Sequence, residues 1–385
     1  MTPKRVIVLG STGSIGEQAL QVAARHPERI RVVGLAAGRS LDALCQQARE
    51  LRPEALALER AANGTEAHLR LCEAAPGAVR FVGPGAAARL VRETESDIVL
   101  NGIVGAAGLA VSLAALERGR RLALANKETL VVGGPLVREA LTRGGELVPV
   151  DSEHSAALQC LGGRPPRDVA RLTLTASGGA LRRHPDWRRA TRAEVLAHPV
   201  WAMGARITVD SALLFNKGLE IIEARWLLDL QWEQIEAVLH PQARVHALVE
   251  FLDGAIMAQA AAADMRLPIQ LAISWPERWG AEWERLPLLP LAGLEFAPIE
   301  TGRFPAFDLA LAAGRAGGTV PCALNAADEV AVQAFLDGQV GLAQVPEIVA
   351  RVVEAHRAEP VESLEQLERV DAWARDLARE QAVRA

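Results

Sequence analysis

Two carboxylates stand two residues apart at the end of an apolar segment. Asp151 and Glu153 follow residues 146–150, which read as a strand. On an extended strand, residues i and i+2 point to the same side, so both carboxylates are predicted to face one spot. Carboxylates that close repel each other unless a proton or a cation lies between them. The alternative is a pair of ordinary surface carboxylates beside a strand end.

A third carboxylate is predicted from the segment 210–220. Glu220 lies three residues after Lys217 and four after Asn216, so the three side chains would share one helical face. Oxygen ligands without His or Cys suit a hard dication such as Mg²⁺ or Mn²⁺. That face could hold a phosphate at one end and the metal at the other. The alternative is a surface salt bridge between Lys217 and Glu220.

Two further segments suit the binding of an anionic substrate. Ser177 precedes two glycines after a strand and offers a hydroxyl beside successive backbone N–H groups, and Ser211 lies six residues before Lys217. Residues 198–204 form a loop bounded by Pro and Gly that contains Trp201. Such a loop suits a lid that excludes water. The alternative is a loop anchored to the core by its Trp.

A glycine-rich turn predicts a dinucleotide site near the N-terminus. Gly10, Gly13 and Gly16 follow a strand and open a helix, where backbone N–H groups can meet a pyrophosphate. The spacing is GxxGxxG rather than the usual GxGxxG, and the alternative is a glycine-rich turn in a sheet that binds nothing.

The second strand ends in Gly38, Arg39 and Ser40 instead of an acidic residue. A cation and a hydroxyl there favour the 2′-phosphate of NADP over NAD, unless Arg39 is an ordinary surface residue. Lys127, at the end of the next-to-last strand of this domain, is predicted to project toward the nicotinamide and the substrate.

Short apolar strands alternate with helices over residues 1–150, which predicts an α/β, doubly wound parallel sheet of seven strands, Rossmann-like. Residues 151–285 read as an α+β catalytic and dimerisation domain. The proline-bearing segment 286–307 reads as a linker, and 308–385 reads as a C-terminal helical bundle.

The composition indicates an ordered globular protein. Half of the 385 residues are apolar, 23% are charged, and the net charge of -5 argues against nucleic acid or an anionic membrane as partner. There is no apolar run of 18 residues, and a strand begins by Arg5, which leaves no room for a signal peptide. Four separated cysteines suit reduced thiols, so we expect a cytoplasmic protein.

Together these motifs resemble the 1-deoxy-D-xylulose 5-phosphate reductoisomerase family, NADPH-dependent enzymes of the methylerythritol phosphate route to isoprenoids. The resemblance covers nearly the whole chain. It is carried by residues 10–16, 125–128, 150–154, 177–179, 198–204, 210–226, 240–242, 264–266 and 323–327.

The resemblance implies a role for each motif residue. The metal ligands would be Asp151, Glu153 and Glu220. The substrate would contact Lys127, Ser152, Glu153, Ser177, His198, Trp201, Ser211, Asn216, Lys217 and Glu220. NADPH would contact Gly10, Thr12, Gly13, Ser14, Ile15, Gly38, Arg39, Ser40, Asn126, Glu128 and Gly204.

The implied reaction isomerises 1-deoxy-D-xylulose 5-phosphate and reduces the rearranged aldehyde to 2-C-methyl-D-erythritol 4-phosphate. A divalent ion would polarise the carbonyl. The expected catalytic set is Lys127, Glu153, His154 and His198. Lys127 would add charge or relay a proton, and either Glu153 or His154 would act on a hydroxyl proton. A homodimer through the central domain is also implied.

Four residues depart from what is common in the family: Ser40 for Asn, Arg206 for Lys, Ala243 for Ser and Asp328 for Asn. None of these changes removes an implied ligand.

Three rival functions remain to be weighed. A short-chain dehydrogenase relies on a Tyr, and this chain has none. A semialdehyde dehydrogenase needs a nucleophilic Cys in a strand-to-helix turn, which Cys160 and Cys322 lack. A non-catalytic NADP sensor would not need the three carboxylates and the lid, and a turnover measurement would separate it from an enzyme.

Overall fold

The computed structural model describes residues 2–280, 282–287, 293–300 and 302–384. It divides into two compact units. Unit 1 comprises Met1–Asn126, Val137–Ser155 and Asp264–Trp283, and unit 2 comprises Lys127–Leu136, Ala156–Ala263 and Glu284–Ala385. The two units are described separately below.

Unit 1 is built on a seven-stranded parallel sheet. Its strands are β1 (Lys4–Leu9), β2 (Ile30–Ala37), β3 (Ala55–Leu58), β4 (Val79–Val82), β5 (Ile98–Asn101), β6 (Arg121–Leu124) and β7 (Glu146–Pro149). Their order is β4-β3-β2-β1-β5-β6-β7, and each neighbouring pair is parallel. The predicted doubly wound α/β sheet is therefore confirmed, and the strand order reverses between β1 and β5, where such sheets bind ligands.

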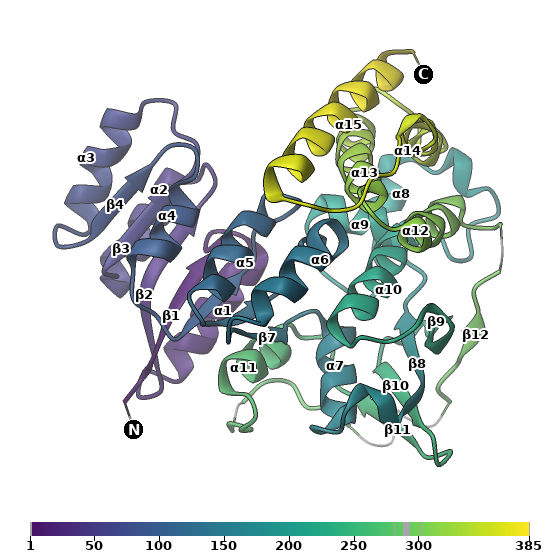
Figure 1. Cartoon of the computed structure of the whole chain (residues 1–385), viewed down its shortest axis with the longest axis horizontal. Helices are drawn as coiled ribbons and strands as arrows, with labels where there is room; N and C mark the ends of the chain where they lie inside the picture. Colours follow the sequence, from purple (N-terminus) through teal and green to yellow (C-terminus); the bar gives the residue numbers. More distant parts are fainter. Residues whose placement is uncertain (1, 281, 288–292, 301, 385) are drawn as a thin grey trace. The chain divides into compact units, whose positions relative to one another are not determined.

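The helices of unit 1 that follow its first five strands alternate with them, as parallel connections require, and one further helix from later in the chain also belongs to this unit (Figure 1). They are α1 (Ser14–Arg25), α2 (Leu41–Leu51), α3 (Gly64–Ala74), α4 (Ala86–Glu93), α5 (Gly108–Glu117) and α11 (Arg266–Ser274). The sequence reading placed residues 264–283 in the central domain, whereas α11 packs against α1 in this unit.

The extended geometry predicted for Asp151 and Glu153 is wrong. The strand β7 ends at Pro149, and the helix α7 (Ser152–Leu161) begins one residue after Asp151. The Asp151 carbonyl oxygen already accepts a helical hydrogen bond from Ser155 N at 2.8 Å. Asp favours the position just before a helix because its side chain can accept from the free N–H groups of the first turn. Here Asp151 Oδ1 lies 3.4 Å from Glu153 N.

Unit 2 contains a second, mixed sheet. Its strands are β8 (Val169–Ala176), β9 (Ile235–Leu239), β10 (Val245–Phe251), β11 (Ile256–Ala260) and β12 (Ala297–Pro298), in the order β11-β10-β8-β9-β12. Only β8 and β9 are parallel; the other neighbours run antiparallel. This is the α+β pattern that the sequence predicts for the middle of the chain.

The helix α10 (Phe215–Leu227) lies between the sheet and a group of helices in unit 2. Its Ile221 and Ala224 belong to the core under the sheet, whereas Leu219 and Ile222 belong to a second core made by the helices. The other helices of unit 2 are α8 (Arg192–Leu196), α9 (Ala205–Ala212), α12 (Pro305–Ala316), α13 (Val320–Leu336), α14 (Gln344–Ala355) and α15 (Leu364–Arg384). Burial on both sides makes α10 the central element of this unit.

A close approach brings the helix α6 (Glu128–Leu141) onto α10. A Cβ atom at Gly134 would collide with the indole ring of Trp226, so only glycine allows this packing. The helical dihedrals of α6 are interrupted at Gly133, and Pro135 follows. The first turns of α6, which follow Lys127, are therefore held against α10.

The C-terminal helical region is confirmed by α12 to α15, which lie together in Figure 1. The predicted linker 286–307 includes residues 288–292 and 301, which lie outside the described residues, and its described part contains the edge strand β12. The domain boundaries at residues 150, 285 and 307 stay predictions. Within the described chain, no helix is both long and apolar enough to cross a bilayer.

Candidate functional site

The glycine-rich turn of unit 1 forms a cradle for an anion. It joins β1 to α1, whose free first-turn N–H groups follow Gly13. Gly10 has a φ of +71°, and a Cβ atom there would lie 2.7 Å from the Gly102 carbonyl oxygen; at Gly16 a Cβ would collide with Gly10 and Ser11. The turn thus fits a pyrophosphate, whose charge suits a helix N-terminus. Three other predicted cofactor residues, Thr12, Ser14 and Ile15, lie in the same turn and are at least partly exposed.

A cationic side chain is available at the end of β2. Gly38, Arg39 and Ser40 are exposed between β2 and α2. Among the described residues, no carboxylate forms an ion pair with Arg39. This arrangement leaves the guanidinium open to a phosphate and fits the predicted preference for NADP.

Asn126 has a structural role besides the predicted cofactor contact. It is buried, and its amide nitrogen donates to the carbonyl oxygens of Ile103 and Gly105, the latter at 2.9 Å. A Cβ atom at Gly108 would lie 2.6 Å from the Asn126 side chain. Asn126 therefore shapes the loop that follows β5, at the point where the strand order reverses.

The start of α7 brings four predicted residues together. The Ser152 hydroxyl donates to the Glu153 carboxylate, and His154 Nδ1 lies 3.3 Å from Asp151 Oδ1. The His154 side chain is fully buried, and Asp151 is 9% exposed. A buried imidazole beside a carboxylate orients that carboxylate, which is the usual task of a residue behind a metal ligand.

In unit 2, Glu220 is a buried carboxylate surrounded by donors. It is 1% exposed, and its oxygens accept from Lys127 Nζ at 3.0 Å, from Lys217 Nζ and from the Asn216 amide. Lys127 and Lys217 are buried as well. The surface salt bridge considered as an alternative for Lys217 and Glu220 is therefore wrong. A carboxylate can be buried here because two ammonium groups and an amide replace its water.

The segment after β8 fits the binding of an oxyanion. Gly178 and Gly179 have φ values of +82° and +62°, which only glycine adopts readily, and a Cβ atom at Gly179 would lie 2.6 Å from the Ser211 carbonyl oxygen. The turn is thereby packed directly against the end of α9. Because Ser177 Oγ accepts from Gly179 N at 3.2 Å and also meets His198, its hydroxyl proton can be donated to a ligand.

The hydrogen bonds of His198 identify its tautomer. Nδ1 accepts from the backbone N–H groups of Val200 and Trp201, at 3.2 and 2.8 Å, so it carries no proton. Nε2 must then carry the proton and donate to Ser177 Oγ at 3.0 Å. Burial lowers the pKa of His198, which also favours this neutral form. In this arrangement His198 is a hydrogen-bond donor that organises both Ser177 and the loop 198–204.

Trp201 is half-buried in a loop without helix or strand, and its ring lies 6.1 Å from that of His246. It belongs to neither hydrophobic core described for unit 2. This placement suits a lid better than a core anchor, although the lid itself stays a prediction. Gly204, a predicted cofactor residue, is exposed at the start of α9.

Sequence reasoning missed the environment of Glu128. The Glu128 carboxylate, predicted to contact the cofactor, accepts from Arg206 Nη1 at 3.2 Å. Arg206 Nη2 also lies 3.4 Å from Asp328 Oδ2. The available signal was that Arg206 and Asp328 both depart from the residues common in the resembled family; the Lys-to-Arg change keeps the positive charge, and the Asn-to-Asp change adds a negative one.

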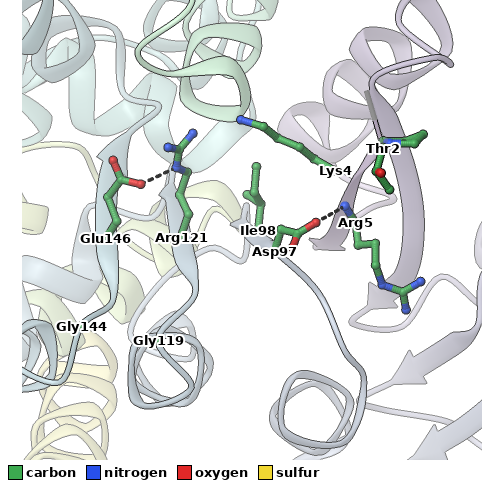
Figure 2. A pocket seen from close by; sticks show the side chains of 10 residues that line it. Thr2, Lys4, Arg5, Asp97, Ile98, Gly119, Arg121, Gly144 and Glu146 are labelled. Carbon is green, nitrogen blue, oxygen red and sulfur yellow. Dashed lines mark hydrogen bonds and ion pairs between the residues drawn. The ribbon is translucent and has the colours of Figure 1, made fainter.

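A separate hollow in unit 1 contains none of the predicted site residues. Figure 2 shows it at the amino ends of the strands, opposite the edge that binds ligands in such sheets. Its charged groups are engaged locally: Arg121 pairs with Glu146 at 2.6 Å, and Asp97 accepts from Arg5 N at 2.7 Å. Lys4 and Arg121 also both donate to the carbonyl oxygen of Ile273, near the end of α11.

Comparison with known proteins assigns the family. A model described as 1-deoxy-D-xylulose 5-phosphate reductoisomerase matches residues 6–134, and two models of its C-terminal domains match residues 147–228 and 261–377. Curated proteins with that name from Heliobacterium modesticaldum and Moorella thermoacetica are 46% and 47% identical. The first alignment covers 98% of this chain and 97% of the relative, and the second covers 97% and 96%.

Solved structures agree with these sequence matches. The reductoisomerase from Zymomonas mobilis in complex with NADPH is 35% identical, with a TM-score of 0.90 and coverage of 99% of both chains. A reductoisomerase in complex with NADPH, fosmidomycin and magnesium is 34% identical, with a TM-score of 0.92 and coverage of 98% of both chains. The chain therefore belongs to the 1-deoxy-D-xylulose 5-phosphate reductoisomerase family.

Proposed function

We propose that this protein converts 1-deoxy-D-xylulose 5-phosphate to 2-C-methyl-D-erythritol 4-phosphate, with NADPH and a divalent cation, in isoprenoid precursor biosynthesis. The observation that carries the proposal is full-length similarity to relatives of that name, at 46–47% identity, in a chain that keeps every implied ligand. The protein is thus an NADP-dependent oxidoreductase.

NADPH would supply the hydride for the reduction. The cradle of Gly10, Gly13 and Gly16 would hold its pyrophosphate, since the glycines leave room that a Cβ would fill. Arg39 would bind the 2′-phosphate as a charged donor. Asn126, Glu128 and Gly204 complete the proposed cofactor residues.

We propose that Asp151, Glu153 and Glu220 share one Mg²⁺ or Mn²⁺ ion, which would act as a Lewis acid toward the substrate. The donor set fits a hard cation because it offers only carboxylate oxygens. Within unit 2, Lys127 and Lys217 donate to the Glu220 carboxylate, which supports its burial as a charged group and our proposal that it is a ligand.

The phosphorylated substrate would be held by residues that donate hydrogen bonds. Ser177 has a hydroxyl proton to give, and Lys217 carries a positive charge. The remaining proposed substrate contacts are Lys127, Ser152, Glu153, His198, Trp201, Ser211, Asn216 and Glu220. These groups bind and orient the substrate, and the 198–204 loop would exclude water over it.

Two of the four expected catalytic residues, His154 and His198, suit roles other than proton transfer. His154 is fully buried against Asp151, so we propose that it positions this carboxylate. His198 is held as a neutral donor by three hydrogen bonds, which suits binding rather than proton removal. Glu153 and Lys127 remain the proposed groups for proton transfer.

We also propose a homodimer. The strand β11 is an edge of the unit 2 sheet, and Leu252, Ile256 and Met257 on or beside it are 72%, 60% and 48% exposed. An edge strand with exposed apolar side chains favours association with a second copy.

We also propose a cytoplasmic location. Cys45, Cys160 and Cys322 are buried free thiols, which suit a reducing compartment.

The function is tested by mixing the purified protein with NADPH, 1-deoxy-D-xylulose 5-phosphate and Mg²⁺ and following the loss of NADPH absorbance. We expect turnover that stops with a chelator and returns with added Mg²⁺ or Mn²⁺. Binding of NADPH without turnover under any metal condition would contradict the proposal and favour the non-catalytic sensor.

The cofactor preference is tested with Arg39→Asp. Loss of the charged hydrogen bond should weaken NADPH binding by roughly 1.5–3 kcal/mol, measured as the dissociation constant, and leave NADH binding nearly unchanged. The matched control is Arg49→Asp, an exposed arginine in α2, the helix that follows Arg39. A wild-type protein that binds NADPH and NADH equally would reject the assignment of Arg39.

The oligomeric state is tested by light scattering. We expect a mass of twice the 41.1 kDa of one chain for the wild type. Ile256→Lys should shift the mass toward the monomer because it places a charge on the edge strand, whereas Leu69→Lys on α3 should not. A wild-type protein that stays monomeric at high concentration would show that the exposed β11 side chains serve another purpose.

A further inference from the structure

A buried network of charged side chains in unit 2 surrounds Arg206, the second residue of α9. Its guanidinium faces carboxylates from three helices. The nitrogen-to-oxygen distances are 3.2 Å to Glu128, 3.4 Å to Asp328, 3.4 Å to Glu329 and 3.7 Å to Asp210, and Asn325 Oδ1 lies at 3.4 Å. One side chain therefore connects the start of α6, the start of α9 and the middle of α13.

The network continues into the last helix. Glu329 on α13 accepts from Arg375 at 2.7 Å and from Asn325 at 2.9 Å. Arg375 on α15 forms a bidentate pair with Asp371, at 2.6 and 3.0 Å. A chain of charged contacts thus runs from Glu128, next to Lys127, to the C-terminal helix.

The network has more negative than positive groups. Five carboxylates, those of Glu128, Asp210, Asp328, Glu329 and Asp371, meet the two guanidinium groups of Arg206 and Arg375. Burial raises the pKa of Asp210 to about 7 and that of Asp328 well above its ordinary value, although Arg206 opposes both shifts. Without the charge of Arg206, the buried carboxylates would repel one another.

We propose that Arg206 is a positioning residue for the reaction. It fixes the carboxylate of Glu128 and, with it, the segment that carries Lys127. It also ties the start of α9, directly after the 198–204 loop, to the C-terminal helices α13 and α15. The helices α13 and α15 thereby fix the position of Glu128, a proposed cofactor residue, and of the start of α9, where the 198–204 loop ends. The inference rests on the proposed function, in which Glu128 contacts NADPH.

With Asp328 opposite, the geometry favours an arginine over a lysine at this position. A planar guanidinium offers five donors and reaches Glu128 through Nη1 and Asp328 through Nη2 at once, whereas a lysine ammonium is a single point charge. Arg206 and Asp328 are thus direct partners. The pair should behave as one unit, so that changing both residues is less harmful than changing Arg206 alone.

A double-mutant cycle tests the proposal with Arg206→Lys, Asp328→Asn and the combined variant. The readouts are the NADPH dissociation constant, KM and kcat, and the rate at which chymotrypsin cleaves after Trp201 in the cofactor-free protein. Arg206→Lys should raise the dissociation constant and KM for NADPH by about tenfold, with a smaller effect on kcat, because Glu128 loses its fixed position. Cleavage after Trp201 should accelerate.

The combined variant should recover NADPH affinity to within about threefold of the wild type and restore slow cleavage. Without the Asp328 carboxylate, the ammonium group at position 206 has one competing partner fewer and can pair with Glu128. The control is Arg379→Lys, whose exposed pair with Asp376 lies on α15 and should change nothing. Additive single effects, or a lower thermal midpoint with unchanged NADPH affinity and cleavage, would overturn the proposal and leave a purely structural network. Failure of the wild type itself to bind NADPH would instead reject the proposed function.

Discussion

The burial of the Glu220 carboxylate on α10 is the constraint on which the rest of unit 2 depends. An ionised carboxylate inside a protein is stable only when donors replace the water it loses, and here Lys127, Lys217 and Asn216 do so. Because α10 lies between the core under the sheet and the core among the helices, its Lys217, Glu220 and Glu223 are buried. The fold therefore holds a costly charged cluster in place, as sites that bind substrates and metal ions require.

The same constraint explains why distant segments meet α10. Lys127 reaches Glu220 because α6 packs closely on α10, where Gly134 leaves room for Trp226. At the other end of the site, the Ser177 turn packs on α9 through Gly179, and α9 leads into α10 after a short connection. The proposed substrate residues of unit 2, although separated in the sequence, are thus held by elements that pack on one another, which favours binding a small phosphorylated molecule in a single orientation.

Much of this could be predicted from the sequence because it depends on local patterns. Apolar strands alternating with helices identified the parallel sheet, and the glycine motif identified the tight turn between β1 and α1. The conformation around Asp151 was predicted wrongly, since a short apolar run does not reveal where a strand gives way to a helix. The Arg206 network was missed for a different reason: its members are spread over more than 240 residues, from Glu128 to Arg375, and no spacing rule connects them.

The most direct test of the account is the binding of Mn²⁺ by calorimetry to the wild type and to Asp151→Asn, Glu153→Gln and Glu220→Gln, with the exposed Glu233→Gln as control. If the three carboxylates share one ion, the wild type binds one Mn²⁺ per chain at this site. Each of the three variants then loses at least about tenfold in affinity, and pairs of changes are non-additive. An unchanged Mn²⁺ affinity in Glu220→Gln would contradict the central claim that the buried carboxylate of α10 is a metal ligand.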